Sequence, residues 1–323
     1  MPRPVTEEDV WRRITQAFPC TGKNALGLPL DDDAALLTPQ AGQQTILTCD
    51  WFLEGTHFLR DRHPADAVGW KCLARATSDI VAMGGSPRCF LLGLALPGSH
   101  SGPWLWGFFE GLQRAAAAFA CNLAGGDTTR RDEILISVTV VGEVPSGKAI
   151  RRSGAKAGDQ VFVSGTLGEA ELGLRMLEKH RGFAQPKNAA LKKQLYPEPP
   201  MALGQWLLRN KLASAMMDLS DGLSSDLPRL ARASGVGAKI VAAQLPITRL
   251  ADRADGISLA LHGGEDYELL FSVRPAVAKR LPETYCGRAL TRIGEITAGK
   301  EIVVEMAGTV KPLAPGGWDP FRK

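Results

Sequence analysis

The sequence predicts a mixed α/β or α+β protein built from two domains. The chain has 323 residues, which is more than one hydrophobic core usually organises. Short apolar runs rich in β-branched residues alternate with segments whose apolar residues repeat at helical spacing. The pattern restarts after Pro145-Ser146-Gly147, so we place a boundary near residue 148 and expect domains over 1–148 and 149–323.

The first domain begins with a helix. Thr6 is a good N-cap, an acidic turn follows it, and Val10 and Ile14 then lie at helical spacing. The next helix is expected to end at Gly84-Gly85, because glycine commonly terminates helices. In chain order, the elements expected after the first helix are a strand over 45–50, a helix over 66–83, a strand over 89–96, a helix over 103–119 and a strand over 134–144.

The second domain repeats the alternation of strands and helices. Its proline-rich segment over 182–200 predicts a loop with room for one short helix. The other elements expected here are a strand over 161–164, a helix from about Glu169, a strand over 213–218, a helix ending near Ser234, and strands over 239–243, 268–273, 290–296 and 301–305.

Composition excludes several classes of protein. The formal net charge is only +4, and Lys and Arg occur in pairs at most, so the sequence has no nucleic-acid-binding pattern. No run approaches the roughly 18 apolar residues of a membrane helix, and the N-terminus lacks the apolar core of a signal peptide. The six cysteines are scattered without a Cys-x-x-Cys pair, which is typical of reduced thiols. We therefore expect a cytoplasmic protein.

Short acidic segments, many of them beside glycine, recur far apart in the chain. An ionised aspartate is costly to bury without a partner, and hard divalent cations are partners that several carboxylates can share. Such cations in turn attract phosphate, so the pattern indicates an enzyme that uses a magnesium–nucleotide complex. The segments are 31–33, 48–50, 78–79, 125–130, 218–222 and 263–266.

Two of these segments have clear structural alternatives. In 218–222, alternation places Asp218 and Ser220 on one side of an extended chain, but Asp and Ser could equally cap the following helix. In 125–130, two glycines expose backbone N–H groups beside Asp127 and two threonines. The same residues would also suit an ordinary hairpin turn.

The remaining candidates have similar alternatives. Asp79 borders the buried stripe of its helix, yet it could simply pair with Arg75 one turn earlier. The triplet 31–33 would be a solvated loop, except that Asp33 leads directly into an apolar run. Gly165-Thr166-Leu167-Gly168 resembles a phosphate-binding turn at a helix N-terminus but lacks the ending of a Walker A loop. His57 alone is more typical of a structural histidine.

Taken in order, these segments resemble the thiamine-monophosphate kinase family, within the superfamily of the aminoimidazole-ribonucleotide synthetases. The resemblance covers nearly the whole chain, and the runs DLSDGL and HGGEDYEL together are specific to this branch. The matching segments are Asp32-Asp33-Ala34, Asp50, 55–58, 78–84, 125–130, 152–155, 218–222, 262–269 and 317–319.

The resemblance implies a site and an assembly. It implies phosphorylation of thiamine monophosphate to thiamine diphosphate by ATP with several Mg²⁺ ions. The N-terminal domain would bind ATP and magnesium and form a β-barrel shared across a homodimer, and the C-terminal domain would complete an active-site cleft. The implied metal positions are Asp33, Thr48, Cys49, Asp50, Asp79, Asp127, Asp218 and Asp221; the ATP contacts are Gly126, Asp127, Arg152 and Ser220; the substrate positions are His57, Glu265 and Trp318; and Asp127, Asp218 and Arg152 would be catalytic.

Two positions depart from the family pattern. The family has glycine where Asp31 stands, and threonine or serine where Cys49 stands. A thiol is a poor ligand for a hard cation, so Cys49 is expected to offer only its backbone carbonyl. Three alternatives stay open: another ATP-using member of the superfamily, a non-catalytic protein that binds thiamine phosphate or nucleotide, and a Mg²⁺-dependent phosphohydrolase.

Overall fold

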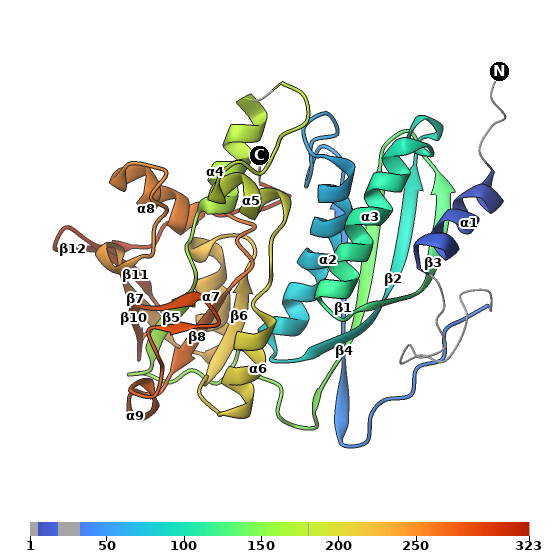
Figure 1. The fold of residues 1–323 in the computed structure, drawn as a ribbon. Helices are drawn as coiled ribbons and strands as arrows, with labels where there is room; N and C mark the ends of the chain where they lie inside the picture. Colours follow the sequence, from blue (N-terminus) through green and yellow to red (C-terminus); the bar gives the residue numbers. More distant parts are fainter. Residues whose placement is uncertain (1–5, 19–32, 180, 323) are drawn as a thin grey trace. The chain divides into compact units, whose positions relative to one another are not determined.

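The computed structural model describes residues 6–18, 33–179 and 181–322. By their contacts the residues form two compact units (Figure 1). Unit 1 comprises Met1–Ile80, Ser86–Gly147 and Leu177–Gln185, and unit 2 comprises Val81–Gly85, Lys148–Met176 and Pro186–Lys323. Among the helices that the structure describes, none is both long and apolar enough to cross a bilayer.

Unit 1 contains a four-stranded sheet in the order β1-β4-β2-β3. The parallel pair is β2 with β3, and the other neighbours are antiparallel. The strands are β1 (Gln43–Leu53), β2 (Ser86–Leu96), β3 (Asn122–Arg130) and β4 (Leu135–Pro145), and the helices are α1 (Glu7–Ala17), α2 (Ala65–Ala82) and α3 (Pro103–Ala118), with a 3₁₀ turn η1 (Gly98–His100). Thr6 and Asp9 form a capping box at α1, so the predicted first helix is confirmed.

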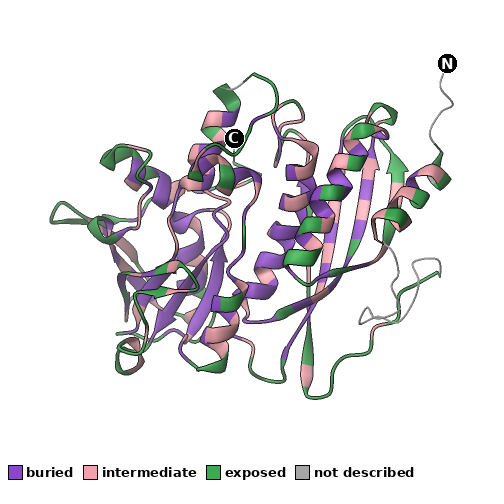
Figure 2. Cartoon of the chain, viewed as in Figure 1, coloured by how far each residue is buried: buried purple, intermediate pink, exposed green. Residues whose placement is uncertain are grey.

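Helices pack on one face of this sheet, as the burial pattern shows (Figure 2). Buried and less buried residues alternate along β4, and Gly142 lies against Ile80 of α2. We call this side the covered face. On the opposite side, which we call the open face, Leu47 is 69% exposed, Trp51 57% and Leu91 41%. The two faces decide where the candidate residues of unit 1 point.

Unit 2 is built around an eight-stranded mixed sheet. The order is β12-β11-β7-β10-β5-β8-β6, with β9 paired to β10 beside this path. The strands are β5 (Gln160–Ser164), β6 (Ala215–Leu219), β7 (Gly237–Val241), β8 (Glu268–Val273), β9 (Thr284–Tyr285), β10 (Arg288–Thr297), β11 (Ile302–Met306) and β12 (Thr309–Pro312), and the helices are α4 (Glu169–Lys179), α5 (Ala189–Leu195), α6 (Met201–Arg209), α7 (Leu223–Ser234), α8 (Arg253–His262) and α9 (Pro275–Ala278), with a 3₁₀ turn η2 (Ala242–Gln244).

Apolar side chains pack on both faces of β6. Met217 and Leu219 belong to a core cluster that includes Leu227 of α7. Met216 instead belongs to a second cluster that includes Leu207 of α6. Because β6 is buried along its whole length, the strand holds the polar turn that follows it in a fixed position.

The structure confirms most predicted elements and corrects several. The glycine-rich segment 125–130 was open to interpretation as a hairpin turn, but it lies within the edge strand β3. An edge strand tolerates glycine and polar residues because only one side of it must pair. The sequence patterns also missed α6, α8 and β12.

Candidate functional site

In unit 1, strand β1 and helix α2 bring together three oxygen-bearing side chains. Thr48 and Asp50 are two residues apart, so both point to the covered face. The Thr48 hydroxyl donates to the carboxylate of Asp79, and Arg75 Nε donates to Asp50 Oδ1 at 3.2 Å. The expected alternative for Asp79 was a pair with Arg75 on the helix surface; the structure instead gives both side chains partners on β1.

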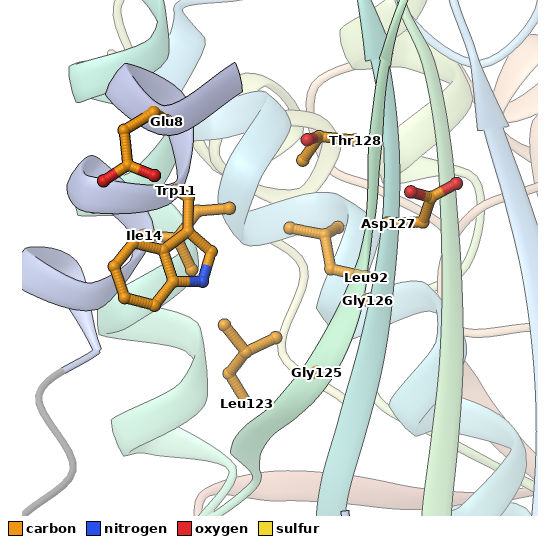
Figure 3. A pocket seen from close by; sticks show the side chains of 9 residues that line it. All are labelled: Glu8, Trp11, Ile14, Leu92, Leu123, Gly125, Gly126, Asp127 and Thr128. Carbon is orange, nitrogen blue, oxygen red and sulfur yellow. The ribbon is translucent and has the colours of Figure 1, made fainter. Parts of the chain in front are cut away.

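Cys49 and Asp127 lie on the open face of the same sheet. Cys49 Sγ is 3.7 Å from Ser137 Oγ. Gly93 pairs with Ser137 on one side and with Asp127 on the other, so these positions form one row across the sheet. Figure 3 shows the Asp127 carboxylate directed away from Leu92 and from the pocket side of β3. The sheet therefore separates Cys49 and Asp127 from Thr48 and Asp50.

A pocket of about 530 Å³ lies between α1 and β3 (Figure 3). Gly126 is essential to its shape, because a Cβ there would lie 1.9 Å from the carbonyl oxygen of Leu92. Apolar groups and a few polar groups line the pocket, a mixture typical of small-molecule sites. The lining residues are Glu8, Trp11, Ile14, Leu92, Leu123, Gly125, Gly126, Asp127 and Thr128.

The other candidates of unit 1 have simpler surroundings. His57 follows β1; its Nδ1 accepts the N–H of Leu53 at 3.0 Å, and its ring stacks on Phe52. These contacts fix the ring, as expected of a structural histidine. Asp33 is exposed at the start of its described segment. Asp31 and Asp32 lie outside the described residues.

The donors on the covered face suit a hard cation. Among the residues that the structure describes, no three His, Cys, Asp or Glu side chains are grouped closely enough to form a metal site by themselves. The hydroxyl of Thr48 and the carboxylates of Asp50 and Asp79 are nevertheless oxygen donors, which Mg²⁺ prefers; Thr48 contacts Asp79, and Asp50 contacts Arg75. Arg75 shows that this cluster accepts a positive charge.

In unit 2, three segments, made mostly of loop residues, meet at the end of β6. We call 218–222, 263–267 and 316–318 together the three-loop cluster. Glu265 N–H donates to the carbonyl of Ser220, and Trp318 N–H donates to that of Asp221, both at 2.8 Å. The chains approach so closely that a Cβ on Gly317 would lie 2.2 Å from the Asp221 carbonyl oxygen. The structure thus brings together Ser220, Asp221, Glu265 and Trp318, which are far apart in sequence.

The loop that carries Ser220 and Asp221 is held by two residues that sequence reasoning missed. Asp226, in the first turn of α7, is fully buried, and its Oδ2 accepts the N–H groups of Ser220 at 3.2 Å and Asp221 at 3.1 Å. Arg229 Nη1 donates to Asp221 at 2.5 Å and to Asp226 at 2.7 Å. Burial and the charge of Asp221 raise the pKa of Asp226 to about 7, although Arg229 opposes them.

The loop 263–267 has an unusual backbone. Glu265 and Tyr267 have φ values of +66° and +48°, which side-chain-bearing residues rarely adopt. Gln194 of α5 donates to Glu265 Oε2 at 3.0 Å. Burial of Glu268 opposes its ionisation, but ion pairs with Lys193 and Arg288 outweigh that effect and lower its pKa. Gln194 therefore holds Glu265 within the strained backbone, and the ion pairs hold Glu268 just after it. Strain that is held in this way indicates a functional constraint.

Asp266 corrects one sequence interpretation. Its carboxylate accepts the N–H of Gly168 at 2.6 Å and that of Ala170 at 3.2 Å, at the start of α4. Burial raises the pKa of Asp266 to about 7, despite these hydrogen bonds and the nearby Lys193. The turn 165–168 was expected to resemble a phosphate-binding turn; a carboxylate of the protein itself occupies those donors, so that interpretation is wrong.

Asp218 and Arg152 have surroundings that differ from those of the other candidates in unit 2. Asp218 is buried near the end of β6, with 3% of its surface exposed. Arg152 is exposed, its carbonyl accepts Ser234 Oγ at the end of α7, and the neighbouring Arg151 pairs with Met216 at the start of β6. Four residues of strand, roughly 13 Å, separate Met216 from Ser220, so the structure does not bring the Arg152 backbone to the three-loop cluster.

Comparisons with known proteins cover both units. Models of the N-terminal and C-terminal domains of AIR synthase related proteins match residues 31–144 and 156–307. A thiamine-monophosphate kinase of Synechococcus elongatus is 39% identical over 289 residues, 88% of each chain. The Escherichia coli K12 kinase is 39% identical over 284 residues, 85% of each chain.

Solved structures agree with these sequence matches. The thiamine-monophosphate kinase of Stenotrophomonas maltophilia superposes with a TM-score of 0.81 at 34% identity, covering 94% of this chain and 96% of that one. A structure described as AaThiL complexed with AMPPCP and TMP has a TM-score of 0.78 at 33% identity, covering 98% and 97%. The hydrogenase maturation protein HypE of E. coli, at 20% identity and a TM-score of 0.76, shares the fold alone.

Proposed function

The chain belongs to the thiamine-monophosphate kinase family, and we propose that it transfers the γ-phosphoryl group of ATP directly and in line to the phosphate of thiamine monophosphate. The observation that carries this proposal is the match to a relative that binds AMPPCP, an ATP analogue, together with TMP, over nearly the whole of both chains. The products would be ADP and thiamine diphosphate.

The reaction must bring two polyanions together. At an effective dielectric constant of about 20, each close pair of like charges repels by roughly 4 kcal/mol. A net charge of +4 spread over the whole chain cannot offset this locally. Bound Mg²⁺ ions would supply the missing positive charge and stabilise the charge that develops on the transferred group. The side chains we propose as their ligands are Asp33, Thr48, Asp50, Asp79, Asp218 and Asp221. We propose Asp127 as the ligand of a separate ion, because it lies on the opposite face of the sheet from Thr48 and Asp50.

The residues of the chain would bind and orient the reactants rather than move protons. The second pKa of a phosphate monoester is near 6, so the acceptor oxygen is already ionised at neutral pH and needs no general base. Alignment and electrostatic stabilisation would account for the rate. We assign Ser220 and Gly126 to the nucleotide, and Trp318 to the thiamine rings, where its half-exposed indole can stack on the cationic thiazolium.

Three further assignments complete the site. We retain Arg152 as a contact to the nucleotide phosphates, made by its long side chain. His57 and Glu265 would lie around the thiamine substrate. For Cys49, the open-face position of its thiol supports a role limited to the backbone, because the neighbouring Thr48 and Asp50 point to the covered face.

We also propose that the protein is a homodimer whose open faces pack together and close into a shared barrel. The support is the row of exposed apolar residues on that face, including Leu47 and Trp51, since large exposed apolar patches mark interaction surfaces. Sedimentation measurements should show twice the chain mass for the wild type and mainly single chains for Trp51→Glu. A wild-type protein that sediments as a single chain at micromolar concentration contradicts this assembly.

The decisive experiment is product analysis after mixing the protein with MgATP and thiamine monophosphate. We expect stoichiometric ADP and thiamine diphosphate, and no reaction when the magnesium is chelated. Binding of both substrates without ADP would indicate a non-catalytic binding protein. Release of inorganic phosphate without thiamine diphosphate would indicate a phosphohydrolase.

A further inference from the structure

The buried carboxylate of Asp226 organises the loop that precedes its own helix. Its Oδ2 accepts two backbone N–H groups, those of Ser220 and Asp221, while Asp226 itself belongs to the first turn of α7. Both hydrogen bonds therefore reach back across the turn. Asp226 has no exposed surface, so these contacts do not compete with solvent at its side chain.

Arg229 extends this arrangement from the backbone to a side chain. One nitrogen, Nη1, donates to Asp226 Oδ1 at 2.7 Å and to Asp221 Oδ2 at 2.5 Å. Arg229 thus bridges the two carboxylates, and the orientation of the Asp221 side chain depends on where Asp226 holds the guanidinium. With one oxygen of Asp221 engaged, its carboxylate presents the other oxygen in a defined direction.

We propose that Asp226 and Arg229 are positioning residues for nucleotide and metal binding: Asp226 fixes the backbone of Ser220 and Asp221, and Arg229 fixes the carboxylate of Asp221. The inference rests on the proposed function, in which Ser220 contacts ATP and Asp221 contacts a divalent cation. Neither positioning residue needs to touch the substrates. Residues that orient ligands in this way typically change metal affinity or activity by about 10- to 100-fold when replaced.

The test compares Asp226→Asn, Arg229→Met and Arg229→Lys. The asparagine can still accept a backbone N–H but must then present its NH₂ group to Arg229, which is also a donor. We expect the KM for MgATP and the half-saturating Mg²⁺ concentration to rise at least about 10-fold for Asp226→Asn and Arg229→Met. Arg229→Lys keeps the charge and should recover part of this loss. The KM for thiamine monophosphate should change much less.

Glu143→Gln is a matched control in unit 1. Glu143 is also buried, its Oε1 accepts the N–H of Gln40 at 3.2 Å, and it pairs with Arg88, but it contacts no proposed site residue through these bonds. This variant should lose thermal stability as Asp226→Asn does. Its KM for MgATP should stay within about twofold of wild type, because a change that touches no site residue affects folding more than binding. An equal rise in KM for the control would overturn the proposal.

Two measurements do not depend on turnover. Hydrogen–deuterium exchange in the unliganded protein should be faster for the Ser220 and Asp221 amides in Asp226→Asn, and calorimetry should show weaker binding of AMPPCP with Mg²⁺. Faster exchange with unchanged AMPPCP affinity would make Asp226 merely structural and refute the proposal. If wild type forms no thiamine diphosphate, the proposed function fails, whereas weaker AMPPCP binding by Asp226→Asn would still support the positioning role.

Discussion

The two units hold their candidate residues in different ways. In unit 1, Thr48, Asp50 and Asp79 project from the faces of a strand and a helix, and side-chain contacts join Thr48 to Asp79 and Asp50 to Arg75. In unit 2, the three-loop cluster is joined by backbone hydrogen bonds, such as those from Glu265 to Ser220 and from Trp318 to Asp221. In a helix or strand, the periodicity of the backbone sets the direction of each side chain, whereas a loop needs specific hydrogen bonds to hold it in place. Replacing a functional side chain should therefore be structurally mild in unit 1, and replacing an anchor in unit 2 should not.

The largest effect is expected from removing one carboxylate charge in either unit. Asp127→Asn and Asp218→Asn should each remain folded dimers with kcat at least ~100-fold lower, the scale of losing one preorganised electrostatic contact. Steady-state kinetics and circular dichroism measure the two properties. Asp132→Asn, an exposed position in unit 1, is the control and should keep full activity. Near-normal turnover in either test variant would argue against its assignment as a metal ligand.

A second comparison concerns the paired glycines of β3. Gly125 and Gly126 have nearly equal φ values, +157° and +158°, so alanine costs similar backbone strain at both. A Cβ on Gly126 would lie 1.9 Å from the Leu92 carbonyl oxygen, whereas the nearest atom at Gly125 is a flexible leucine methyl at 3.6 Å. Gly126→Ala should reduce the free energy of unfolding by roughly 1–3 kcal/mol more than Gly125→Ala, by chemical denaturation. Equal losses would show that the close approach is unimportant.

A smaller and more selective effect is expected at Trp318. Losing its stacking and cation–π contact should raise the KM for thiamine monophosphate about 5- to 30-fold in Trp318→Ala, with the KM for ATP unchanged. Phe321→Ala removes a ring that is 95% exposed three residues later and should change neither constant. An unaltered KM for thiamine monophosphate in Trp318→Ala would remove this residue from the substrate site.

The smallest effect is a pH dependence that originates beside the three-loop cluster. Burial lowers the pKa of His262, whose Nδ1 lies 2.9 Å from Ser224 Oγ. A histidine with a depressed pKa stabilises the fold above its unfolded pKa of about 6.5, and this contribution is lost as pH falls through the folded pKa. Compared with wild type, His262→Asn should therefore lose less unfolding free energy between pH 7 and 5. Parallel pH profiles for the two proteins would contradict this.

The sequence predicted those elements whose local pattern agrees with their tertiary environment. The helix predicted over 66–83 is confirmed, since α2 ends at Ala82. Its apolar stripe and the glycines that follow it both indicated the same helix. The helix α6 was missed because Pro197, Pro199 and Pro200 directly precede it and indicated a loop. The segment 125–130 is rich in residues typical of turns, and only its parallel pairing with β2 makes it a strand.

For the candidate site, sequence reasoning named individual side chains but not the contacts that join them. The opposite directions of Thr48 and Cys49 follow from alternation along a strand, which is a local property. The contact between Ser220 and Glu265 depends on the pairing of β6 with β8, and the contact between Asp221 and Trp318 depends on the path of the chain after β12; no local pattern encodes either. Asp226 was overlooked because an acid in the first turn of a helix is ordinary, and only its burial distinguishes it.

The alternation of β1 has a consequence for insertions and deletions. Ile46 and Phe52 enter the apolar core on the same side as Thr48 and Asp50. Removing a single residue from the start of this strand would reverse every following side chain, burying Trp51 and turning Asp50 outward. Homologous chains should therefore tolerate many substitutions at the outward positions of this strand while keeping its length constant.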